Sequence, residues 1–460
     1  MATPAVTTSI NRLFHAYDVR GRVDTDLGCG IAMEIARAYG DYLAPNGDGY
    51  FVIGHDVRAS SPGLAEAVSL GLRSGGHGVT HIGLCSTPML YWNGADGGYT
   101  GSVMITASHL PAVYNGMKFC REDAIPLSAA RGLPEVRKRI RPLETRTFAC
   151  SPVLRHASPL EDYARMLRRY LSPQRELKVA VDAGNGMGAL TIEKTLGNLD
   201  LISLVTLGME TDPTFPERGA NPLAPHAIKP LAAAVRDNHC DFGVAFDGDA
   251  DRAIAVDESG AMIPPDLLGA LIALHLLQSH PGAMILHDLR ASRSVSESLA
   301  AAGGSTLQTR VGHAFIKQAM REHRALFALE LSGHYYYADL HHTDNGLRTL
   351  IELINLVAAA NRPLSQLIAP LARYPTSGEI NLRVTDTDAA LDILEKRYPG
   401  HDIQHLDGLS IGGKNWWLNA RPSNTEPLLR LNVGATTLEV LERHRREALD
   451  VLAPFEQQES

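Results

Sequence analysis

Apolar residues recur along most of the chain with two spacings, one typical of helices and one of buried strands. Apolar side chains at positions 31, 35, 38, 39 and 42 share one helical face. Ser60-Ser61-Pro62 supplies a cap residue and a proline at the first helical position, which predicts a second helix that reaches Ser74. Short apolar runs lie between such helices, at 50–54, 101–105, 178–181 and 242–246. This order predicts buried strands of parallel βαβ units and therefore an α/β fold.

Three of the predicted strands end in compact polar loops. The first strand leads into Thr106-Ala107-Ser108-His109, the second into residues 247–252, and the third, at 326–329, into residues 330–334. Open α/β sheets bind ligands beyond the carboxyl ends of their strands. We therefore predict three similar α/β domains with mixed or parallel sheets, whose polar loops face one cleft.

The C-terminal part of the chain has a different pattern. Alternating residues predict strands at 379–384, 416–418 and 429–433, and helical periodicity predicts helices at 386–398 and 437–452. This order is typical of a smaller α+β domain with an antiparallel sheet. The predicted domains are 1–154, 155–259, 260–368 and 369–460.

Composition excludes several classes of protein. With 460 residues the chain is too long for one compact core, and its net charge of −8 with few aromatic residues argues against nucleic-acid binding. No apolar run reaches the about 18 residues of a membrane span, and no signal peptide is evident near the start. The five cysteines are scattered without a CxxC pair. We expect a reduced cytoplasmic protein that does not contact a membrane.

The sequence Asp247-Gly248-Asp249-Ala250-Asp251 places three carboxylates at alternate positions. Side chains in such a loop can converge on one ion, and oxygen ligands suit Mg²⁺ or Ca²⁺ better than zinc. A solvated acidic turn is the alternative, but a buried strand that leads into the loop disfavours it. An EF-hand is excluded because Arg252 occupies the position that needs glycine.

The other polar loops carry weaker signals when each is taken alone. Ser108 has a hydroxyl that needs activation, and His109 beside it does not by itself imply Ser–His catalysis. Glu330, Ser332 and His334 can bind sugar hydroxyls and move protons. The loop that begins at Arg421 fits either a phosphate dianion or a simple turn. Residues 184–188 match no nucleotide-binding motif and predict a packing turn.

Together, these loops resemble the α-D-phosphohexomutase family, in its bacterial phosphomannomutase/phosphoglucomutase branch. The family's loops TASHNP, DGDGDR, GEMSGH and RPSNTEP correspond in order to residues 106–111, 247–252, 329–334 and 421–427. Residues 17–21, 114–118 and 309–313 are similar to three further family segments. Leu110 replaces the family's asparagine, which removes a polar amide beside the serine, while Ala250 and Leu331 replace a glycine and a methionine.

The resemblance implies a heart-shaped molecule around a central cleft and a defined reaction. Hexose 1-phosphate, of glucose or mannose or both, is converted reversibly to hexose 6-phosphate through a phosphoserine at Ser108 and a 1,6-bisphosphate intermediate. Mg²⁺ is bound by Asp247, Asp249, Asp251 and Ser108, and glucose 1,6-bisphosphate serves as activator. The implied catalytic residues are Ser108, Arg20, His109, Lys118 and His334. The implied substrate contacts are Tyr17, Arg290, Gly312, His313, Glu330, Ser332, Arg421, Ser423, Asn424 and Thr425.

Two other functions remain open from the residues alone. A magnesium-dependent sugar-phosphate phosphatase would use the same groups, and a sugar-phosphate or calcium-binding protein would need no catalysis. The sequence does not rank glucose against mannose, and glucosamine phosphate is a less favoured substrate. The expected partners are small sugar phosphates, with no nucleic acid and no membrane, and the expected state is a monomer.

Overall fold

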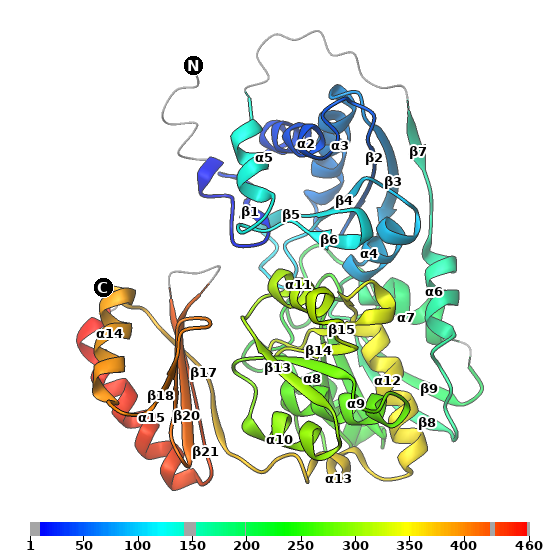
Figure 1. The fold of residues 1–460 in the computed structure, drawn as a ribbon. Coiled ribbons are helices and arrows are strands. Elements are labelled where there is room, and N and C mark those ends of the chain that lie inside the picture. The colour runs from blue at the N-terminus through cyan, green and yellow to red at the C-terminus, as the bar shows by residue number, and fades with distance from the viewer. Residues whose placement is uncertain (1–9, 142–152, 198, 424–427, 458–460) are drawn as a thin grey trace.

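Four β-sheets packed with helices follow one another along the chain (Figure 1). The structure is a computed structural model, which describes residues 10–141, 153–197, 199–423 and 428–457. Three sheets mix parallel and antiparallel strands, and the C-terminal sheet is antiparallel throughout. The predicted fold class, three α/β domains and a smaller C-terminal α+β domain, is confirmed.

The first unit contains a sheet with strand order β1-β5-β4-β2-β3-β7, and β6 pairs with β5. Its strands are β1 (Val19–Arg22), β2 (Tyr50–His55), β3 (Gly78–Leu84), β4 (Gly101–Ile105), β5 (Tyr114–Arg121), β6 (Ile125–Pro126) and β7 (Leu154–His156). Its helices are α2 (Cys29–Leu43), α3 (Ser61–Ser74), α4 (Thr87–Asp96) and α5 (Leu133–Arg139). Helix α3 begins at Ser61, so Pro62 occupies the second helical position and not the predicted first.

The second unit has strand order β11-β10-β8-β9 and the third has β13-β12-β14-β15-β16. The second contains α6 (Leu160–Arg168), β8 (Leu177–Asp182), α7 (Gly188–Leu196), β9 (Ile202–Leu207), α8 (Lys229–Asp237), β10 (Phe242–Phe246) and β11 (Ala253–Asp257). The third contains α9 (Pro265–Ser279), β12 (Met284–Asp288), α10 (Arg293–Ala301), β13 (Ser305–Thr309), α11 (His313–His323), β14 (Phe327–Leu329), β15 (Tyr335–Tyr337), β16 (Thr343–Asp344), α12 (Gly346–Ala360) and α13 (Leu364–Ile368).

The first three units share one arrangement of four strands. The orders β5-β4-β2-β3, β11-β10-β8-β9 and β15-β14-β12-β13 each combine three parallel strands with one antiparallel strand. In each unit, the loop from the third parallel strand to the antiparallel strand is one of the three polar loops found in the sequence. Because the topology repeats, the three loops occupy equivalent sheet edges.

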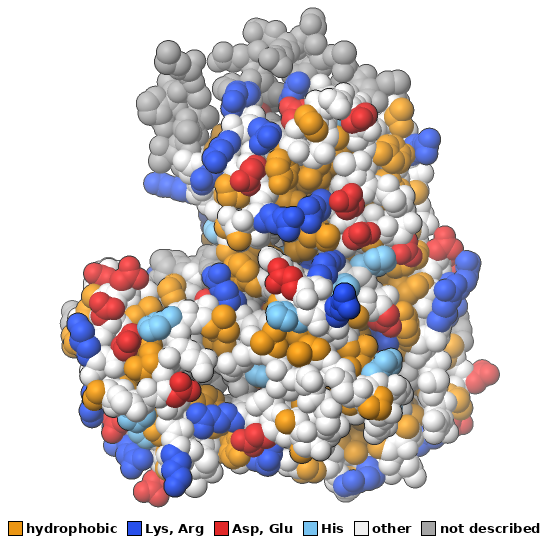
Figure 2. Space-filling model, viewed as in Figure 1, with side chains coloured by type: hydrophobic (Ala, Val, Ile, Leu, Met, Phe, Trp, Pro, Cys, Tyr) orange, Lys and Arg blue, Asp and Glu red, His pale blue; other side chains and the backbone are white. Residues whose placement is uncertain are grey.

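The C-terminal unit has strand order β17-β21-β20-β19-β18 and its own hydrophobic core. Its elements are β17 (Thr376–Leu382), α14 (Thr387–Arg397), β18 (Asp402–Gln404), β19 (Leu409–Gly412), β20 (Trp416–Pro422), β21 (Leu429–Ala435) and α15 (Leu438–Leu452). Strands β18 and β19 were not predicted. By contrast, one large core joins helix α4 of the first unit to the second and third units. Figure 2 shows the surface hollowed between the first and C-terminal units.

None of the helices in the described part of the chain is long and apolar enough to cross a membrane.

Candidate active site

The loop after β4 presents Ser108 to the next unit of the molecule. Ser108 adopts a left-handed backbone conformation, with φ of 53°, and its side chain is buried. Its N–H donates to Thr106 Oγ1 at 2.8 Å, and its Oγ donates to Asp247 Oδ2 at 2.9 Å. Nδ1 of His109 lies 3.3 Å from the same Oγ. The serine hydroxyl therefore points at the acidic loop of the second unit.

The acidic loop after β10 brings its three carboxylates together. Asp247, Asp249 and Asp251 are buried, and each offers an oxygen within 4.8 Å of the others. The turn at 184–188 packs against this loop, because a Cβ on Gly186 would lie 2.6 Å from Gly248 O. The interpretation of that turn as a packing element is thus confirmed.

Lys118, on β5, lies across two of these aspartates. Its Nζ donates to Asp249 Oδ2 at 2.7 Å and to Asp251 Oδ2 at 2.6 Å. Burial lowers the pKa of Lys118, but the two carboxylates outweigh this and hold the pKa above its usual value. Burial and the neighbouring Asp251 and Asp249 raise the pKa of Asp247 well above its usual value. The loop therefore concentrates negative charge beyond what one lysine balances.

The same loop fits a hard divalent cation. Oδ1 of Asp249 is buried and accepts no hydrogen bond from the described residues, whereas Oδ1 of Asp251 faces His334 Nε2 at 3.2 Å. Buried carboxylate oxygens without a donor are costly unless a cation neutralises them. Three carboxylates, with oxygen as the sole ligand type, match the preference of magnesium or calcium.

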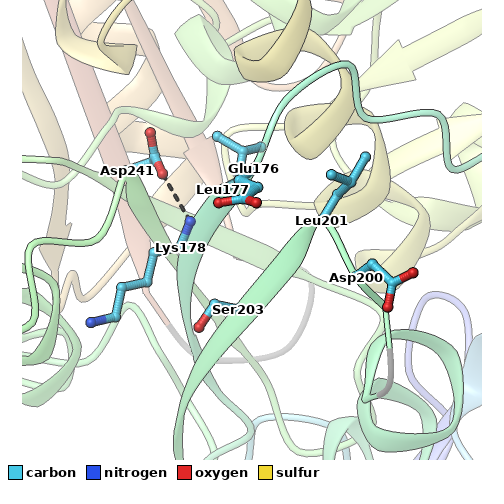
Figure 3. A pocket seen from close by; sticks show the side chains of 7 residues that line it. All are labelled: Glu176, Leu177, Lys178, Asp200, Leu201, Ser203 and Asp241. Atoms are coloured by element: carbon cyan, nitrogen blue, oxygen red, sulfur yellow. Dashed lines mark hydrogen bonds between the residues drawn. The ribbon is translucent and has the colours of Figure 1, made fainter.

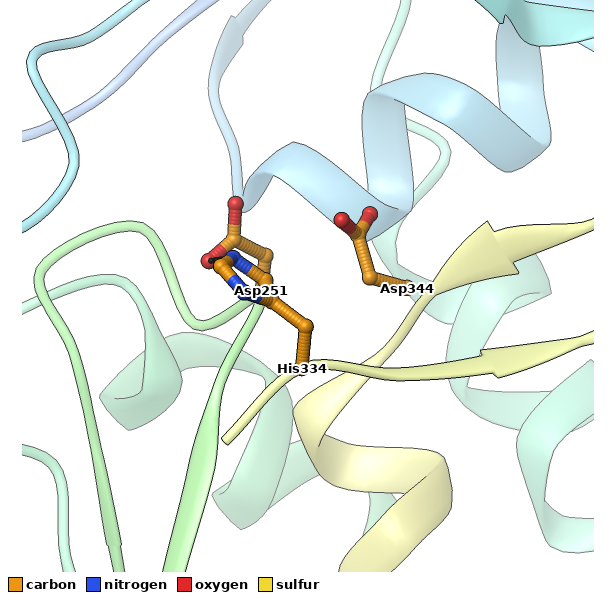
Figure 4. Close-up of side chains that lie close together, drawn as sticks. All are labelled: Asp251, His334 and Asp344. Atoms are coloured by element: carbon orange, nitrogen blue, oxygen red, sulfur yellow. Dashed lines mark ion pairs between the residues drawn. The ribbon is translucent and has the colours of Figure 1, made fainter. Parts of the chain in front are cut away.

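A second acidic group, Asp251, His334 and Asp344, lies nearby (Figure 4). His334 Nε2 is 3.2 Å from Asp251 Oδ1, and its Nδ1 is 3.0 Å from Glu330 Oε2. Burial lowers the pKa of His334, but Asp251 and Glu330 outweigh it and raise the pKa to about 9. Both ring nitrogens of His334 face carboxylate oxygens, so neither is directed at a free coordination position. Asp344 is also 2.9 Å from Lys317 Nζ, so this group is an ion-pair network.

The loop after β14 places Glu330, Ser332 and His334 around one point. Ser332 Oγ lies 2.8 Å from His334 Nδ1, and Tyr336 donates to Glu330 Oε2 at 3.0 Å. Burial raises the pKa of Glu330, but His334 and Arg290 outweigh it and hold the pKa below its usual range. The carboxylate of Glu330 is therefore ionised and can accept hydrogen bonds from hydroxyl groups.

Further cationic and aromatic groups surround the serine. Arg252 Nη2 lies 3.0 Å from His109 Nδ1, and burial together with Arg252 holds the pKa of His109 well below its usual value. Arg20 is buried and pairs with Asp18 at 2.6 Å. The Tyr17 ring meets the His313 ring edge-on at 4.5 Å, and a Cβ on Gly312 would lie 2.9 Å from the Tyr17 ring. The N-terminal segment thus reaches the third unit.

In the C-terminal unit, three arginines converge on the carboxylate of Glu379. Arg421 Nη2 and Arg290 Nη1 lie 3.3 Å and 3.0 Å from Oε2, and Arg430 Nη1 lies 3.1 Å from Oε1. The Nε atom of Arg421 is buried and has no hydrogen-bond partner among the described residues. This cluster can bind a phosphate dianion. Ser423 N–H donates to Leu428 O at 2.8 Å, whereas Asn424 and Thr425 lie outside the described residues.

The structure adds residues that the sequence interpretation missed. Thr87, at the first position of α4, donates from Oγ1 to Asp249 Oδ2 at 2.6 Å and from its N–H to Asp249 O at 3.1 Å. No local pattern distinguishes Thr87 or Glu379, because each acts through a partner distant in the chain. Asp56 and Arg58 were also missed, although an internal repeat marks them.

Two surface hollows are lined by none of the polar-loop residues. One, of about 280 Å³, lies at the amino ends of β8 and β9, where Lys178 N–H donates to Asp241 at 2.9 Å (Figure 3). The polar loops follow the opposite ends of the parallel strands, so this hollow is separate from them. Another, of about 180 Å³, lies between α10 and the strands β19 and β20.

Comparisons with known proteins agree with this geometry. Family models for phosphoglucomutase/phosphomannomutase match in order: alpha/beta/alpha domains I, II and III at residues 11–145, 161–260 and 264–374, and the C-terminal domain at 379–451. The "Phosphohexose mutases" protein of Xanthomonas campestris is 38% identical over 428 residues, covering 91% of this chain and 94% of that protein. The phosphomannomutase of Salmonella montevideo is 36% identical, with coverage of 95% and 98%. A crystal structure of a phosphoglucomutase/phosphomannomutase family protein from Burkholderia thailandensis has a TM-score of 0.87 at 30% identity and covers 97% of this chain and 98% of that one.

Proposed function

Because the chain belongs to the phosphoglucomutase/phosphomannomutase family and is a phosphohexomutase, we propose that it interconverts hexose 1-phosphates and hexose 6-phosphates through phosphorylated Ser108. The observation that carries the proposal is the contact between Ser108 Oγ and Asp247 Oδ2, 2.9 Å long, which joins two units of the chain. It brings a hydroxyl that can carry phosphate to a loop that can neutralise its charge.

The proposed reaction consists of two phosphoryl transfers. In the first, the bond between phosphorus and Ser108 Oγ breaks and a sugar hydroxyl oxygen forms the new bond to phosphorus. The sugar hydroxyl gives up its proton to a neighbouring side chain, and Ser108 Oγ takes up a proton and becomes a hydroxyl again. The resulting 1,6-bisphosphate, of glucose or mannose, turns in the site and returns its other phosphate to Ser108. Free glucose 1,6-bisphosphate activates the enzyme because it can phosphorylate an unmodified Ser108.

Asp247, Asp249 and Asp251 would hold Mg²⁺, with the phosphate on Ser108 as a further ligand. When bound, the ion neutralises charge that develops during transfer. The buried Oδ1 of Asp249, which has no hydrogen-bond partner among the described residues, supports this assignment.

The chain's own side chains orient the substrate and the moving proton. Lys118 and Arg20 supply positive charge near Ser108, and His109, which is neutral, lies within reach of its Oγ. Glu330 and Ser332 would bind the sugar hydroxyls, and His334, protonated near neutral pH, is poised to donate a proton. The remaining contacts are Tyr17, Arg290, Gly312 and His313 around the sugar, and Arg421, Ser423, Asn424 and Thr425 around the phosphate that is not transferred. We assign these roles to units bounded at 1–154, 155–259, 260–368 and 369–460.

A product assay tests the proposal. Glucose 1-phosphate and mannose 1-phosphate are each supplied with Mg²⁺, with and without glucose 1,6-bisphosphate, and both 6-phosphate and free phosphate are measured. A mutase forms the 6-phosphate and releases no free phosphate. Stoichiometric release of free phosphate would instead establish a phosphatase, and binding without either product would establish a binding protein.

Replacement of Arg421 by alanine should weaken both directions of the reaction. Arg421 contributes hydrogen bonds to a charged group, each worth about 1.5–3 kcal/mol, so kcat/KM should fall roughly 10- to 100-fold. Because the bound phosphate positions the reacting hydroxyl, KM should rise and kcat should fall together. Steady-state kinetics from 1-phosphate and 6-phosphate measure both effects.

The control for this variant is Arg445→Ala. Arg445 pairs with Glu442 at 2.5 Å on the half-exposed face of α15 in the same unit, and it is not one of the three arginines that meet Glu379. It should retain normal kinetics. Normal kinetics in both directions for Arg421→Ala would refute the role of Arg421.

A further inference from the structure

A short repeat in the sequence occupies equivalent positions in the first and third units. His55-Asp56-Val57-Arg58-Ala59-Ser60 and His287-Asp288-Leu289-Arg290-Ala291-Ser292 differ only at the third position. The copies span the ends of β2 and β12, each the middle of the three parallel strands in the shared arrangement.

In each copy, the arginine donates its backbone N–H and its Nε–H to the aspartate two residues before it. In the first, Arg58 donates its N–H to Asp56 Oδ1 at 3.1 Å and its Nε–H to Asp56 Oδ2 at 3.0 Å. In the second, Arg290 donates its N–H and its Nε–H to Asp288 Oδ1 at 2.7 Å and 3.3 Å. Each aspartate therefore fixes the direction of its arginine.

The far ends of the two arginines meet different partners. Arg290 reaches the carboxylates of Glu330 and Glu379 in the candidate site. Arg58 is fully buried, and it donates to four backbone carbonyls between Ser108 and Tyr114. Nη2 donates to Ser108 O at 2.8 Å and Leu110 O at 2.7 Å, and Nη1 donates to Pro111 O at 2.7 Å and Tyr114 O at 3.0 Å. All four acceptors lie on the segment that carries Ser108.

Asp56 supports the same segment from its other side. Asp56 Oδ2 accepts from Thr106 Oγ1 at 2.7 Å, and Thr106 Oγ1 accepts from Ser108 N–H at 2.8 Å. A serine with φ of 53° carries strain of about 1–3 kcal/mol, which such bonds can offset. The pair of Asp56 and Arg58 thus holds both the amide and the carbonyl of Ser108.

We propose that Arg58, aligned by Asp56, is the positioning residue of the nucleophile and fixes Ser108 Oγ toward the acidic loop. The inference rests on the proposed function of Ser108. A guanidinium donates from two terminal nitrogens in one plane, whereas a lysine ammonium is a single point and cannot reach four separated carbonyls. Loss of this fork shifts the serine and leaves the phosphate cluster around Glu379 intact.

The test is Arg58→Lys. A displacement of about 1 Å at a reacting atom can cost roughly 100-fold in rate, so kcat should fall by that order while KM stays near the wild-type value. The rate at which Ser108 takes up phosphate from glucose 1,6-bisphosphate, followed by intact-mass spectrometry after rapid quenching, should fall by the same factor. Loss of folded protein alone would lower the apparent kcat and the amplitude of phosphate uptake, but not the rate constant of uptake, so that rate constant separates positioning from stability.

Arg321→Lys is the matched control. Arg321 also donates to backbone carbonyls, those of Lys317 at 3.0 Å, Asp123 at 2.9 Å and His341 at 2.6 Å, but none of these lies on the serine loop. It should lose stability and keep normal kcat and phosphate uptake. Equal loss of kcat in both variants would overturn the proposal, as would wild-type kcat and uptake in Arg58→Lys.

If Arg58→Lys does not fold, Thr106→Val tests instead whether the hydrogen bonds around the serine loop position Ser108. Valine keeps the side-chain volume and removes the hydroxyl between Asp56 and Ser108. A lower kcat with unchanged KM supports the proposal, and an unchanged kcat in the folded variant overturns it. The proposed function itself fails on a different result, in which Ser108 of the wild-type protein takes up no phosphate.

Discussion

Ser108→Ala should abolish sustained turnover while the protein stays folded. The substitution removes a single oxygen, whose one strong bond is to Asp247 Oδ2 at 2.9 Å. Without it no phosphoenzyme forms, and the Mg²⁺ and phosphate sites have no group to act on. Loss of the nucleophile of a serine protease costs about 10⁶-fold in kcat, and a loss of at least roughly 10⁴-fold is expected here.

Intact-mass spectrometry measures the effect directly. The wild-type protein should carry one phosphate after incubation with glucose 1,6-bisphosphate, and Ser108→Ala should carry none. Ser102→Ala is the control, because Ser102 is also buried and lies on β4 before the loop. It should behave as the wild type, and a phosphate that maps to any residue other than Ser108 would disprove the assignment.

The sequence predicted those parts of the site that are local in the chain. The loops at Ser108, Asp247 and Glu330 each follow an apolar strand, and a repeated topology brings such strand ends to equivalent edges. The three carboxylates also converge because they are alternate residues of one loop. Periodicity and loop chemistry were therefore sufficient for the fold class and for the acidic centre.

Contacts between distant segments were not predictable in the same way. Glu379 is a single acid on β17, and nothing nearby in the sequence indicates that Arg290, Arg421 and Arg430 meet it. Lys118 was expected near the phosphoserine by resemblance, but its bridge between Asp249 and Asp251 depends on the packing of two units.

Local backbone geometry was also beyond the sequence pattern. Ser108 and Ala250 have positive φ values of 53° and 62°, although neither residue type favours that region. Tertiary bonds impose it, such as those from Arg58 to the serine loop.

Strand β18 was missed because its three residues, Asp402–Gln404, are too few for a period to be detected.

Asp249→Asn should strongly weaken Mg²⁺ binding and change stability much less. Asp249 Oδ2 accepts from Lys118 Nζ at 2.7 Å and from Thr87 Oγ1 at 2.6 Å, bonds that an amide oxygen can retain. The amide nitrogen then replaces Oδ1, the atom without a hydrogen-bond partner among the described residues. Lys118 keeps its second partner, Asp251, so no buried charge is left alone. The fold therefore keeps its hydrogen bonds, while the ion loses a charged ligand.

The expected loss of Mg²⁺ affinity is large. Loss of a residue that only hydrogen-bonds to a metal-binding side chain already costs about 10- to 100-fold in metal affinity. Replacement of a side chain that binds the ion directly should therefore cost at least roughly 100-fold. Phosphoryl transfer should slow in parallel, because the charge that develops on the moving phosphate is less well neutralised. Titration calorimetry with Mg²⁺ and denaturant unfolding of the same preparations separate binding from stability.

Asp257→Asn is the matched control for the effects on Mg²⁺ affinity and stability. Asp257 ends β11 in the same unit, and its Oδ1 accepts from Ser259 N–H at 2.9 Å, Ser259 Oγ at 2.6 Å and Ala261 N–H at 3.0 Å. All these partners form a turn outside the acidic loop, so the substitution should lower stability somewhat and leave Mg²⁺ affinity unchanged. If Asp249→Asn bound Mg²⁺ as tightly as Asp257→Asn, the three aspartates would be charges balanced by Lys118, Arg252 and His334 and not a metal site. Because Oδ1 of Asp249 is buried and receives no proton donor from the described residues, we expect the two variants to differ.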